Sequence, residues 1–301
     1  MEFRNFVLTA AVFLTAVTSC IAASLQRRVI GGELTSKGDY PFLVSLWYMK
    51  ENGFTNNTKM HHVCGGALIA PSWVLTAAHC FDARVLKGID VKESWKVVAG
   101  KFNQLADEDS DQFRTITEIH TYQGWNIKKL LGDAALLKLN EPVDLSREDV
   151  SVISPDTDPS CAVAGADCYV VGWGQIAEKP YGYGMYIPVV ADMPVVDTET
   201  CVEAMKPENV DNRNVTIDDS LICAGHVEGD VDACSGDSGG PLVCVCDFVE
   251  VVSGIVSHGH GCARENLYGI YTRVSLLKDW IDDVISGKDN TGQPQTETIQ
   301  L

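Results

Sequence analysis

Residues 232–241 read Asp-Ala-Cys-Ser-Gly-Asp-Ser-Gly-Gly-Pro and place one serine, Ser238, among glycines and near two carboxylates. A serine hydroxyl is a weak nucleophile at its own pKa. It needs a base that takes its proton, and hydrogen-bond donors that hold the charge developing on the attacked carbonyl oxygen. The glycines leave room for backbone N–H groups to approach that oxygen, so the stretch predicts Ser238 as the nucleophile of an acyl-transfer reaction.

A base and an acid for this serine lie upstream. His79 stands in Thr-Ala-Ala-His-Cys, and Asp133 begins the apolar run Asp-Ala-Ala-Leu-Leu-Lys-Leu. The letters around Ser238 also fit the Gly-x-Ser-x-Gly turn of α/β-hydrolases, in which the acid and the histidine follow the serine. Only 63 residues follow Ser238, which is too little chain for the rest of such a sheet. The chain order His79, Asp133, Ser238 is therefore favoured.

Short strands must position these side chains. Runs rich in Val, Leu and Ile alternate with clusters of Gly, Asn, Asp and Pro, which is typical of an all-β protein. The clearest runs lie at residues 42–46, 95–99, 169–171 and 251–256. Near the C-terminus the period changes, and apolar residues recur at helical spacing. They predict one amphipathic helix over residues 275–286, with Leu276, Leu277, Trp280, Ile281, Val284 and Ile285 on its apolar face.

With these motifs in place, the chain resembles the trypsin-like serine proteases, which have the chymotrypsin fold, over about residues 29–286. The match rests on six motifs in family order: Val-Ile-Gly-Gly at 29–32, Thr-Ala-Ala-His-Cys at 76–80, Asp133 with its Leu-rich run, Gly-Trp-Gly at 172–174, Gly-Asp-Ser-Gly-Gly-Pro at 236–241 and Gly-Ile-Tyr-Thr at 269–272. The resemblance implies two six-stranded antiparallel β-barrels packed face to face, followed by a C-terminal helix. The barrels would meet at about residues 144–160, with the active site in the cleft between them.

The resemblance also implies a role for each reactive residue. His79 would take the proton of Ser238, and Asp133 would fix the imidazole tautomer and stabilise its cation. The backbone N–H groups of Gly236 and Ser238 would form the oxyanion hole. Taken alone, His79 could be an ordinary surface or core histidine and Asp133 a turn residue. Their place in the motifs favours catalysis.

A specificity pocket is implied by Asp232, with Ser257, Gly259 and Gly269 on its walls. A buried carboxylate needs a partner, so Asp232 would select a substrate Arg or Lys side chain. The alternative for Asp232 is a solvated loop carboxylate. Ala233 removes a hydroxyl beside Asp232, which in this family favours Arg over Lys.

Two departures from the family pattern leave other functions open. His258 replaces a tryptophan on the cleft wall, and Ser235 replaces a longer residue at the pocket rim. Both changes keep a chymotrypsin-like or broad specificity as an alternative to Arg/Lys specificity. A protease-fold protein that binds a partner without cutting it is a further alternative, and the complete set of His79, Asp133 and Ser238 argues against it.

Eleven cysteines in an exported chain indicate disulfides. One, Cys20, lies in the leader. From the family pattern the other ten would pair as Cys64–Cys80, Cys201–Cys223, Cys234–Cys262 and Cys168–Cys244, with Cys161 and Cys246 left over. Because Cys244 and Cys246 lie on one strand face, a fifth bridge between Cys161 and Cys246 is sterically reasonable. A metal site built on Cys-x-Cys is the alternative.

No cofactor and no metal are expected. The acidic run at residues 107–111 resembles the family's calcium loop, but Lys101 stands where a first carboxylate ligand would be. Calcium needs carboxylate or carbonyl ligands, and an ammonium group can take the cation's place. Tyr268 lies at a position where an aromatic residue accompanies sodium binding in some family members and is simply packed in others.

The chain ends have a processing pattern. Residues 6–23 are apolar, follow Arg4 and end in small residues, so residues 1–23 are interpreted as a signal peptide of a secreted protein. Residues 24–28 would be a short activation propeptide. Cleavage after Arg28 would free the Val29 amine, which in this family pairs with Asp237. The tail at 287–301 is rich in Thr, Gln, Asn and Gly and is expected to be disordered.

The net charge of −18 and the pI near 4.6 argue against nucleic acid and anionic membranes as partners. No later segment is long and apolar enough for a membrane anchor. The expected partners are protein or peptide substrates and protease inhibitors, and a monomer is expected. Asn56 and Asn214 stand in Asn-x-Thr sequons and are candidate glycan sites.

Overall fold

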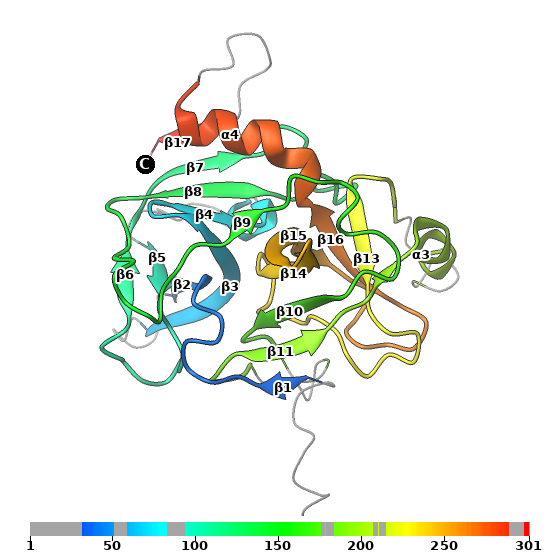
Figure 1. Ribbon diagram of the computed structural model, residues 1–301, viewed down its shortest axis with the longest axis horizontal. Coiled ribbons are helices and arrows are strands. Elements are labelled where there is room, and N and C mark those ends of the chain that lie inside the picture. The colour runs from blue at the N-terminus through cyan, green and yellow to red at the C-terminus, as the bar shows by residue number, and fades with distance from the viewer. Residues whose placement is uncertain are drawn as a thin grey trace, which may run out of the picture.

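The computed structural model describes residues 32–50, 59–82, 94–175, 178, 184–206, 210, 215–288 and 298–300. The predicted signal peptide, Arg28, Val29 and both sequon asparagines lie outside these residues. Within them the chain forms two curled, almost wholly antiparallel sheets that lie side by side, with a helix across the top of the view in Figure 1.

The first sheet contains eight strands in the described residues. Their order is β17 (Thr298–Gln300), β7 (Ile116–Thr121), β8 (Ala135–Leu139), β4 (Trp73–Thr76), β3 (Lys59–Ala70), β2 (Leu43–Lys50), β5 (Trp95–Ala99) and β6 (Gln112–Arg114). The predicted runs at 42–46 and 95–99 correspond to β2 and β5.

The second sheet contains nine strands in the described residues. Their order is β1 (Glu33–Leu34), β11 (Val189–Asp192), β10 (Cys168–Gly172), β14 (Pro241–Cys246), β15 (Val249–His258), β16 (Gly269–Arg273), β13 (Leu221–Ala224) and β12 (Val195–Val196). β9 (Ser154–Pro155), in the segment between the two halves, pairs in parallel with β15. The runs at 169–171 and 251–256 correspond to β10 and β15.

These sheets confirm the expected fold class, although the strand count differs from two sets of six. In the described residues each sheet holds six strands of four or more residues, and the others have only two or three. The short strands arise where a loop or terminus runs along an open sheet edge and uses its unpaired N–H and C=O groups. One of them, β17, pairs with β7 and falls within the tail expected to be disordered.

The predicted C-terminal helix is present. A 3₁₀ turn, η2 (Val274–Leu277), leads into α4 (Lys278–Ser286), and Gly287 ends the helix with a left-handed backbone conformation. Leu277, Trp280 and Ile281 are buried, and the Trp280 ring lies 5.4 Å from that of Tyr122. Leu276 and Ile285 are exposed, in contrast to their expected place on the apolar face. A second helix, α3 (Thr198–Ala204), was not predicted.

α3 is short, and its first turn is capped by Asp197, whose side chain accepts a hydrogen bond from the Thr200 N–H. Its only buried residue is Cys201, so it has almost no apolar stripe that a periodicity argument could detect. None of the helices in the described ranges is long and apolar enough to cross a bilayer.

Five disulfides crosslink the described residues, in the pairs that the sequence suggests: Cys64–Cys80, Cys161–Cys246, Cys168–Cys244, Cys201–Cys223 and Cys234–Cys262. The Cys161–Cys246 bridge ties the segment between the two halves to the end of β14. Cys244 and Cys246 stand two residues apart on that strand, which brings both bridges to one face.

Candidate active site

The first half of the molecule positions His79 and Asp133. His79 lies in η1 (Ala78–Phe81), directly after β4, and the neighbouring Cys80 is tied to β3 by the Cys64 disulfide. Asp133 lies two residues before the start of β8, which pairs with β4. The two residues are joined twice, because the His79 N–H donates to Asp133 Oδ1 at 2.8 Å and His79 Nδ1 lies 2.7 Å from Asp133 Oδ2.

Burial and hydrogen bonding set the charges of this pair. Asp133 has no exposed surface. Burial alone would raise its pKa, but the hydrogen bonds and charge of His79 and the Ser257 hydroxyl outweigh burial and hold the pKa of Asp133 below its ordinary value. Burial alone would lower the pKa of His79, and the Asp133 carboxylate outweighs it, so the pKa of His79 is raised.

Ser257 from β15 completes the shell around Asp133. Its hydroxyl donates to Asp133 Oδ2 at 2.6 Å, and Thr272 on β16 donates to the Asp133 carbonyl at 3.1 Å. Ser257 was predicted only as a pocket-wall residue. One contact is to the Asp133 carboxylate and the other to its main-chain carbonyl. Both link Asp133 in the first half to strands of the second half, so they fix how the two halves are placed at the site.

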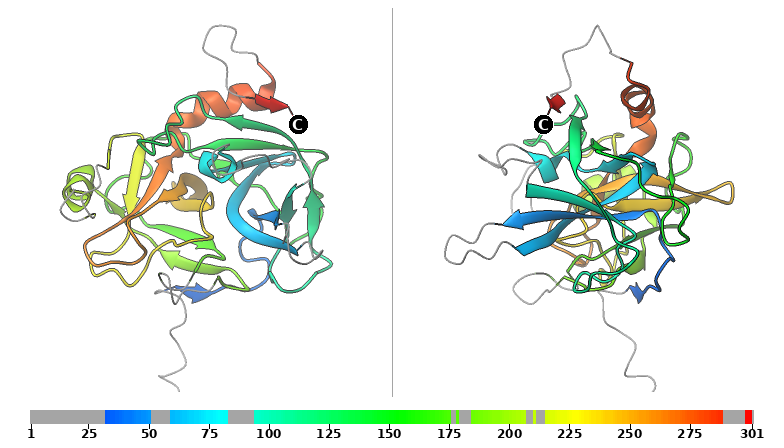
Figure 2. Two further views of the ribbon diagram at one scale, coloured as in Figure 1. Left: turned by 180° about the vertical axis from the view of Figure 1, so that it is seen from behind. Right: turned by 90° about the vertical axis from the view of Figure 1, so that its left-hand side faces the viewer.

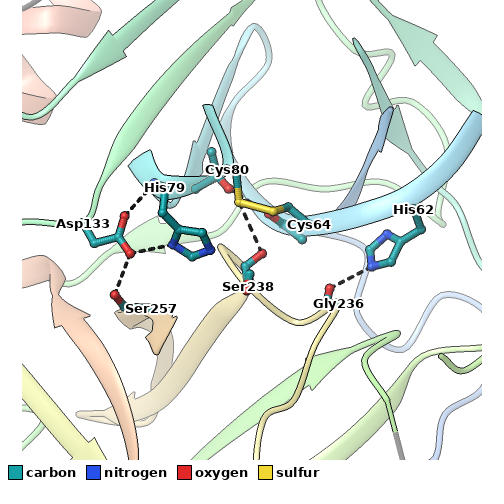
Figure 3. The surroundings of a disulfide bond; sticks show 10 residues. His62, Cys64, His79, Cys80, Asp133, Gly236, Ser238 and Ser257 are labelled. Carbon is teal, nitrogen blue, oxygen red and sulfur yellow. Dashed lines mark hydrogen bonds and ion pairs between the residues drawn. A yellow bond between two sulfur atoms is a disulfide. The ribbon is translucent and has the colours of Figure 1, made fainter. Parts of the chain in front are cut away.

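Ser238 comes from the second half, in the loop three residues before β14 begins at Pro241. Its carbonyl accepts a hydrogen bond from the Gly65 N–H on β3 at 2.8 Å, which anchors the serine loop to the first half. Figure 3 shows the His79 ring lying between Asp133 and Ser238. The structure therefore brings together the three residues that the sequence singled out.

The Asp237 side chain holds the loop before Ser238 in place through both of its carboxylate oxygens. The Asp237 carboxylate accepts hydrogen bonds from the Gly174 N–H at 2.7 Å and the Cys234 N–H at 3.0 Å. A side chain at Gly174 would overlap that carboxylate. Burial raises the pKa of Asp237 to about 6. No salt bridge in the described part of the chain includes Asp237, so its charge is balanced there only by N–H dipoles.

A cavity of about 370 Å³ opens beside Ser238. Its lining includes the predicted residues Asp232, Ser257, Gly259 and Gly269, and also Ser235 and His258. Asp232 Oδ2 accepts from the Ala263 N–H at 3.0 Å, while Asp232 Oδ1 is buried without a partner. Burial raises the pKa of Asp232 to about 7.

Gly269 keeps this carboxylate accessible. A Cβ at position 269 would come within 2.8 Å of Asp232 Oδ1 and within 2.9 Å of the Tyr271 hydroxyl. A Cβ at Gly259 would have an ordinary van der Waals contact, at 3.4 Å from the Gly261 carbonyl. The cavity therefore depends on glycine at 269 much more than at 259.

His258 on the cavity wall is linked to Asp133 through Ser257. Because the Ser257 hydroxyl donates to Asp133, it must accept from His258 Nδ1, which lies 3.1 Å away. That leaves His258 Nε2 as a buried acceptor without a partner. Burial lowers the pKa of His258 to about 4, so the imidazole is neutral at physiological pH.

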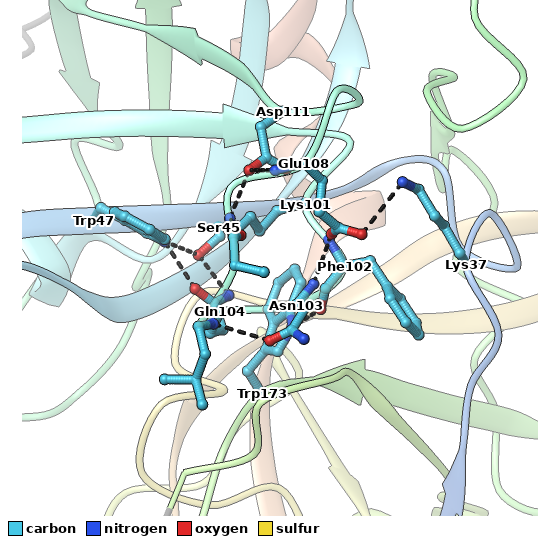
Figure 4. A network of polar contacts seen from close by, with 12 residues as sticks. Lys37, Ser45, Trp47, Lys101, Phe102, Asn103, Gln104, Glu108, Asp111 and Trp173 are labelled. Atoms are coloured by element: carbon cyan, nitrogen blue, oxygen red, sulfur yellow. Dashed lines mark hydrogen bonds and ion pairs between the residues drawn. The ribbon is translucent and has the colours of Figure 1, made fainter.

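The loop that resembles a calcium site is closed by a lysine. Lys101 Nζ lies 2.6 Å from the Ala106 carbonyl, 2.6 Å from Asp111 Oδ2 and 5.0 Å from the centre of the Trp47 ring (Figure 4). These are the oxygen atoms that a cation in this loop would use, and the ammonium group already takes them. The residues present therefore do not fit a calcium ion. Tyr268, the other candidate cation position, is 7% exposed and packs around Cys201 and Cys223.

Replacing Lys101 by methionine is expected to destabilise the protein by about 3–5 kcal/mol, because Asp111 would be left buried without its cation. The side chains of Lys101 and Asp111 are 0% and 2% exposed. Lys37→Met is the matched control, since the Lys37 side chain is 42% exposed in its ion pair with Glu108 and should contribute less than about 1 kcal/mol. Urea unfolding of both variants measures the difference, and equal losses would contradict this account of the loop.

Sequence reasoning did not identify several polar residues around the site. His62 and Ser45 form a hydrogen-bonded pair whose outer end reaches the Gly236 carbonyl. Arg264 and Glu178 form a two-point ion pair at the cavity rim, at 2.9 and 2.6 Å. Arg264 and Glu178 stand 86 residues apart, and His62 stands 174 residues from Gly236. No local motif marks either contact.

Comparison with known proteins identifies relatives along nearly the whole chain. The family model described as Trypsin matches residues 29–281. Trypsin II-P29 of Gallus gallus is 32% identical over 281 residues, which cover 91% of this chain and 98% of that protein. Trypsin of Xenopus laevis is 31% identical over 91% of this chain and 97% of its own length, and Trypsin-3 of Salmo salar is 31% identical over 86% and 93%.

Proposed function

The chain belongs to the trypsin family of serine endopeptidases, and from this premise we propose that it is secreted as a zymogen and cleaves peptide bonds after Arg and Lys. The observation that carries the specificity is the unpartnered Oδ1 of Asp232 in the cavity beside Ser238. A buried carboxylate oxygen without a donor is costly, and a cationic side chain that enters the cavity would relieve that cost.

In the proposed reaction the Ser238 hydroxyl attacks the substrate carbonyl carbon while its proton passes to His79 Nε2. The Nδ1 hydrogen bond to Asp133 holds the ring in the tautomer that leaves Nε2 free to accept, and stabilises the resulting imidazolium. The Gly236 and Ser238 N–H groups stabilise the oxyanion. His79 then protonates the leaving amine, and water hydrolyses the acyl-enzyme by the same steps.

Arginine is expected to be preferred over lysine. A guanidinium offers five N–H donors in a planar fork, while an ammonium offers three from one point. Both Asp232 Oδ1 and the Tyr271 hydroxyl are buried without partners beside Gly269. The planar fork can donate to several acceptors at once. Ala233 offers no hydroxyl that could bridge a lysine ammonium group and the Asp232 carboxylate.

Activation after Arg28 is supported by the position of β1. Leu34 pairs with Val189 of β11, which pairs with Gly172 of β10, and a side chain at Gly172 would overlap the Asp237 carboxylate. Two strand spacings of about 4.8 Å therefore separate Leu34 from the region of Asp237. Five extended residues cover about 16 Å, so the Val29 amine can reach Asp237.

Arg28→Gln is expected to yield a secreted, folded protein with at most residual activity. Without the new ammonium group, Asp237 would be a buried carboxylate with no cation, and the oxyanion loop should rest in another arrangement. Activity is measured before and after treatment with a trypsin-like protease, with Arg27→Gln as the matched control that keeps Arg28. Full activity of uncleaved Arg28→Gln protein would rule this activation mechanism out.

The pH dependence of kcat and kcat/KM should distinguish the titration of His79 from that of Asp232. Because the pKa of His79 is raised, kcat should begin to fall on the acid side at a pH above the ordinary histidine value of about 6.5. Because burial raises the pKa of Asp232 to about 7, kcat/KM for Arg substrates should show an additional loss below that pH. An ester substrate with a neutral side chain should lack the additional loss. Identical acid limbs for both substrates would contradict the role given to Asp232.

A cleavage-preference profile of the activated enzyme on a peptide library tests the proposed specificity. Cleavage dominated by Arg and then Lys is expected. Dominance of Phe, Tyr or Leu would favour the chymotrypsin-like alternative, in which His258 and Ser235 reshape the cleft. A folded, correctly processed protein that cleaves no peptide would favour a binding protein.

A further inference from the structure

Four apolar side chains reach the surface around the loop closed by Lys101. Leu105 in that loop is 71% exposed, Phe113 on β6 is 43% exposed, and Tyr186, shortly before β11, is 59% exposed. Trp47 on β2 is half-buried. Large apolar side chains with this much exposed surface add little to the core, and their surface is available to a partner. We call Trp47, Leu105, Phe113 and Tyr186 the apolar strip.

The members of the strip are adjacent to one another. The Trp47 and Phe113 rings meet edge to face, with their centres 6.0 Å apart. Trp47 Nε1 donates to Gln104 Oε1 at 2.9 Å (Figure 4), and the Gln104 N–H donates to the Tyr186 carbonyl at 2.7 Å. Leu105 follows Gln104 directly. β6 lies at the left of Figure 1, on the side that the right-hand view of Figure 2 turns toward the reader.

The loop that carries Leu105 is held from within. Lys101 Nζ lies 2.6 Å from the Ala106 carbonyl and 2.6 Å from Asp111 Oδ2. Asn103 Oδ1 accepts from the Leu105 N–H at 2.9 Å. The strip is thus formed before a partner arrives, which removes the ordering cost that a flexible loop would add to binding.

Ser238 lies between the cavity and the first half of the molecule. The described residues that line the cavity, from Gln175 to Tyr271, all belong to the second half. From the first half, the Gly65 N–H on β3 donates to the Ser238 carbonyl at 2.8 Å, and Cys80 Sγ lies 3.9 Å from the same oxygen. A substrate whose side chain fills the cavity therefore directs its leaving segment toward β3.

β3 connects Ser238 with the strip. Trp47 pairs with His62 on β3, two residues from Cys64 and three from Gly65. One strand spacing, about 4.8 Å, separates Trp47 from β3. An extended peptide advances about 3.3 Å per residue, so residues beyond about the third after the cleaved bond reach the strip.

The charge around the strip indicates the chemistry of its partner. Asp107 and Asp109 are exposed in the same loop as Leu105. The two lysines that contact this loop already form ion pairs with its other carboxylates. Exposed carboxylates beside an apolar surface favour a partner in which aliphatic or aromatic side chains are flanked by Lys or Arg. The net charge of −18 acts in the same direction.

We infer that the apolar strip binds the segment of a polypeptide substrate that follows the cleaved bond, and that it favours apolar side chains flanked by Lys or Arg. The inference rests on the proposed function, because its occupant is the polypeptide cleaved at Ser238. The leaving segment already lies against β3, beside Trp47, so the strip continues the active site. Its contacts are remote from the reacting atoms and contribute equally to ground-state and transition-state binding.

The test compares two substrates that share every residue up to the cleaved bond. One is a chromogenic anilide, which has no residue after the bond. The other continues for about eight residues, with leucines and lysines beyond the third, which is long enough to cover the strip. Leu105→Ser should raise KM for the extended peptide by about 3–10-fold at unchanged kcat, because the contact loses an apolar side chain. Hydrolysis of the anilide should stay unchanged.

Leu276→Ser is the matched control, because Leu276 is 52% exposed in η2 and lies outside the strip. It should leave both substrates unaffected. Equal losses for the anilide and the extended peptide in Leu105→Ser would show a structural role and overturn the inference. An extended peptide that is cleaved equally well by wild type and Leu105→Ser would overturn it as well.

A second arm tests the charge preference. Replacing the downstream lysines of the extended peptide by glutamates should lower kcat/KM by about 2–5-fold at low salt, and added salt should reduce the difference. Asp109→Lys should remove most of the difference, while Asp230→Asn, an exposed aspartate of the second half, should retain it. An identical lysine preference in Asp109→Lys would overturn the part given to the loop carboxylates.

A second copy of the chain is the other occupant that the test distinguishes. A concentration-dependent dimer in sedimentation velocity that Leu105→Ser abolishes would overturn the inference in favour of self-association. Both substrates carry whichever residue the wild-type enzyme prefers in the cleavage profile, so a failure of the Arg/Lys assignment leaves this comparison intact. Folded, processed protein that cleaves neither substrate would overturn the proposed function and, with it, this inference.

Discussion

Ser238→Ala is expected to lower kcat by about 10⁶-fold while the protein stays folded, because the residues of a catalytic triad act as one unit. Without the hydroxyl, His79 has no nucleophile to activate. The raised pKa of His79 and the buried charge of Asp133 then no longer contribute to the rate. The rate that remains would come from substrate binding and oxyanion stabilisation alone.

The measurement is burst and steady-state kinetics on the activated variant, beside its thermal unfolding. Ser36→Ala is the matched control, because Ser36 is an exposed serine outside the cavity whose backbone N–H contact to Asp39 survives the change. Undiminished activity of folded Ser238→Ala protein would refute the assignment of the nucleophile.

Asp232→Ser is expected to lower kcat/KM for Arg substrates by about 10²–10⁴-fold, since a buried cation that loses its partner costs about 3–5 kcal/mol. The loss should be much smaller for substrates with apolar side chains, which gain nothing from the carboxylate. The variant also removes the group whose burial raises its pKa to about 7, so the acid limb specific to Arg substrates should disappear.

Asp230→Asn is the matched control for this change. Asp230 is exposed, lies two residues before Asp232 and adopts a positive φ of 67° that asparagine tolerates well. It should leave both substrate classes unaffected. Equal losses for Arg and apolar substrates in Asp232→Ser would indicate collapse of the cavity and contradict the proposed ion pair.

The sequence was sufficient for the parts of the molecule that depend on short, contiguous motifs. Ser238 and Asp232 lie in one ten-residue stretch, and His79 adjoins a cysteine, so their proximity in the fold followed once the family pattern was recognised. The long strands carry dense runs of Val, Leu and Ile. α4 has two buried apolar residues near its start, Trp280 and Ile281, and Leu277 at the end of η2 is buried just before them. Patterns of this kind can be recognised in the sequence without knowledge of tertiary contacts.

Contacts between distant segments could not be predicted. Ser257 reaches Asp133 across 124 residues, and His62 reaches Gly236 across 174. Neither contact has a local signature, because the partners meet only when the two halves pack. The exposed positions of Leu276 and Ile285 have the same origin, since the face that α4 buries is decided by what lies beneath it. The short edge strands depend on backbone pairing, which leaves no pattern in side-chain type.

Covalent labelling with a fluorophosphonate tests the central claim most directly, because the reagent reacts with a serine only when that serine is activated and an oxyanion hole is in place. Protein cleaved after Arg28 should take up one label, and peptide mass spectrometry should map it to Ser238. The uncleaved Arg28→Gln protein and a His79→Ala variant should take up almost none. Correctly cleaved, folded wild-type protein that stays unlabelled, or that carries the label on another residue, would contradict the account.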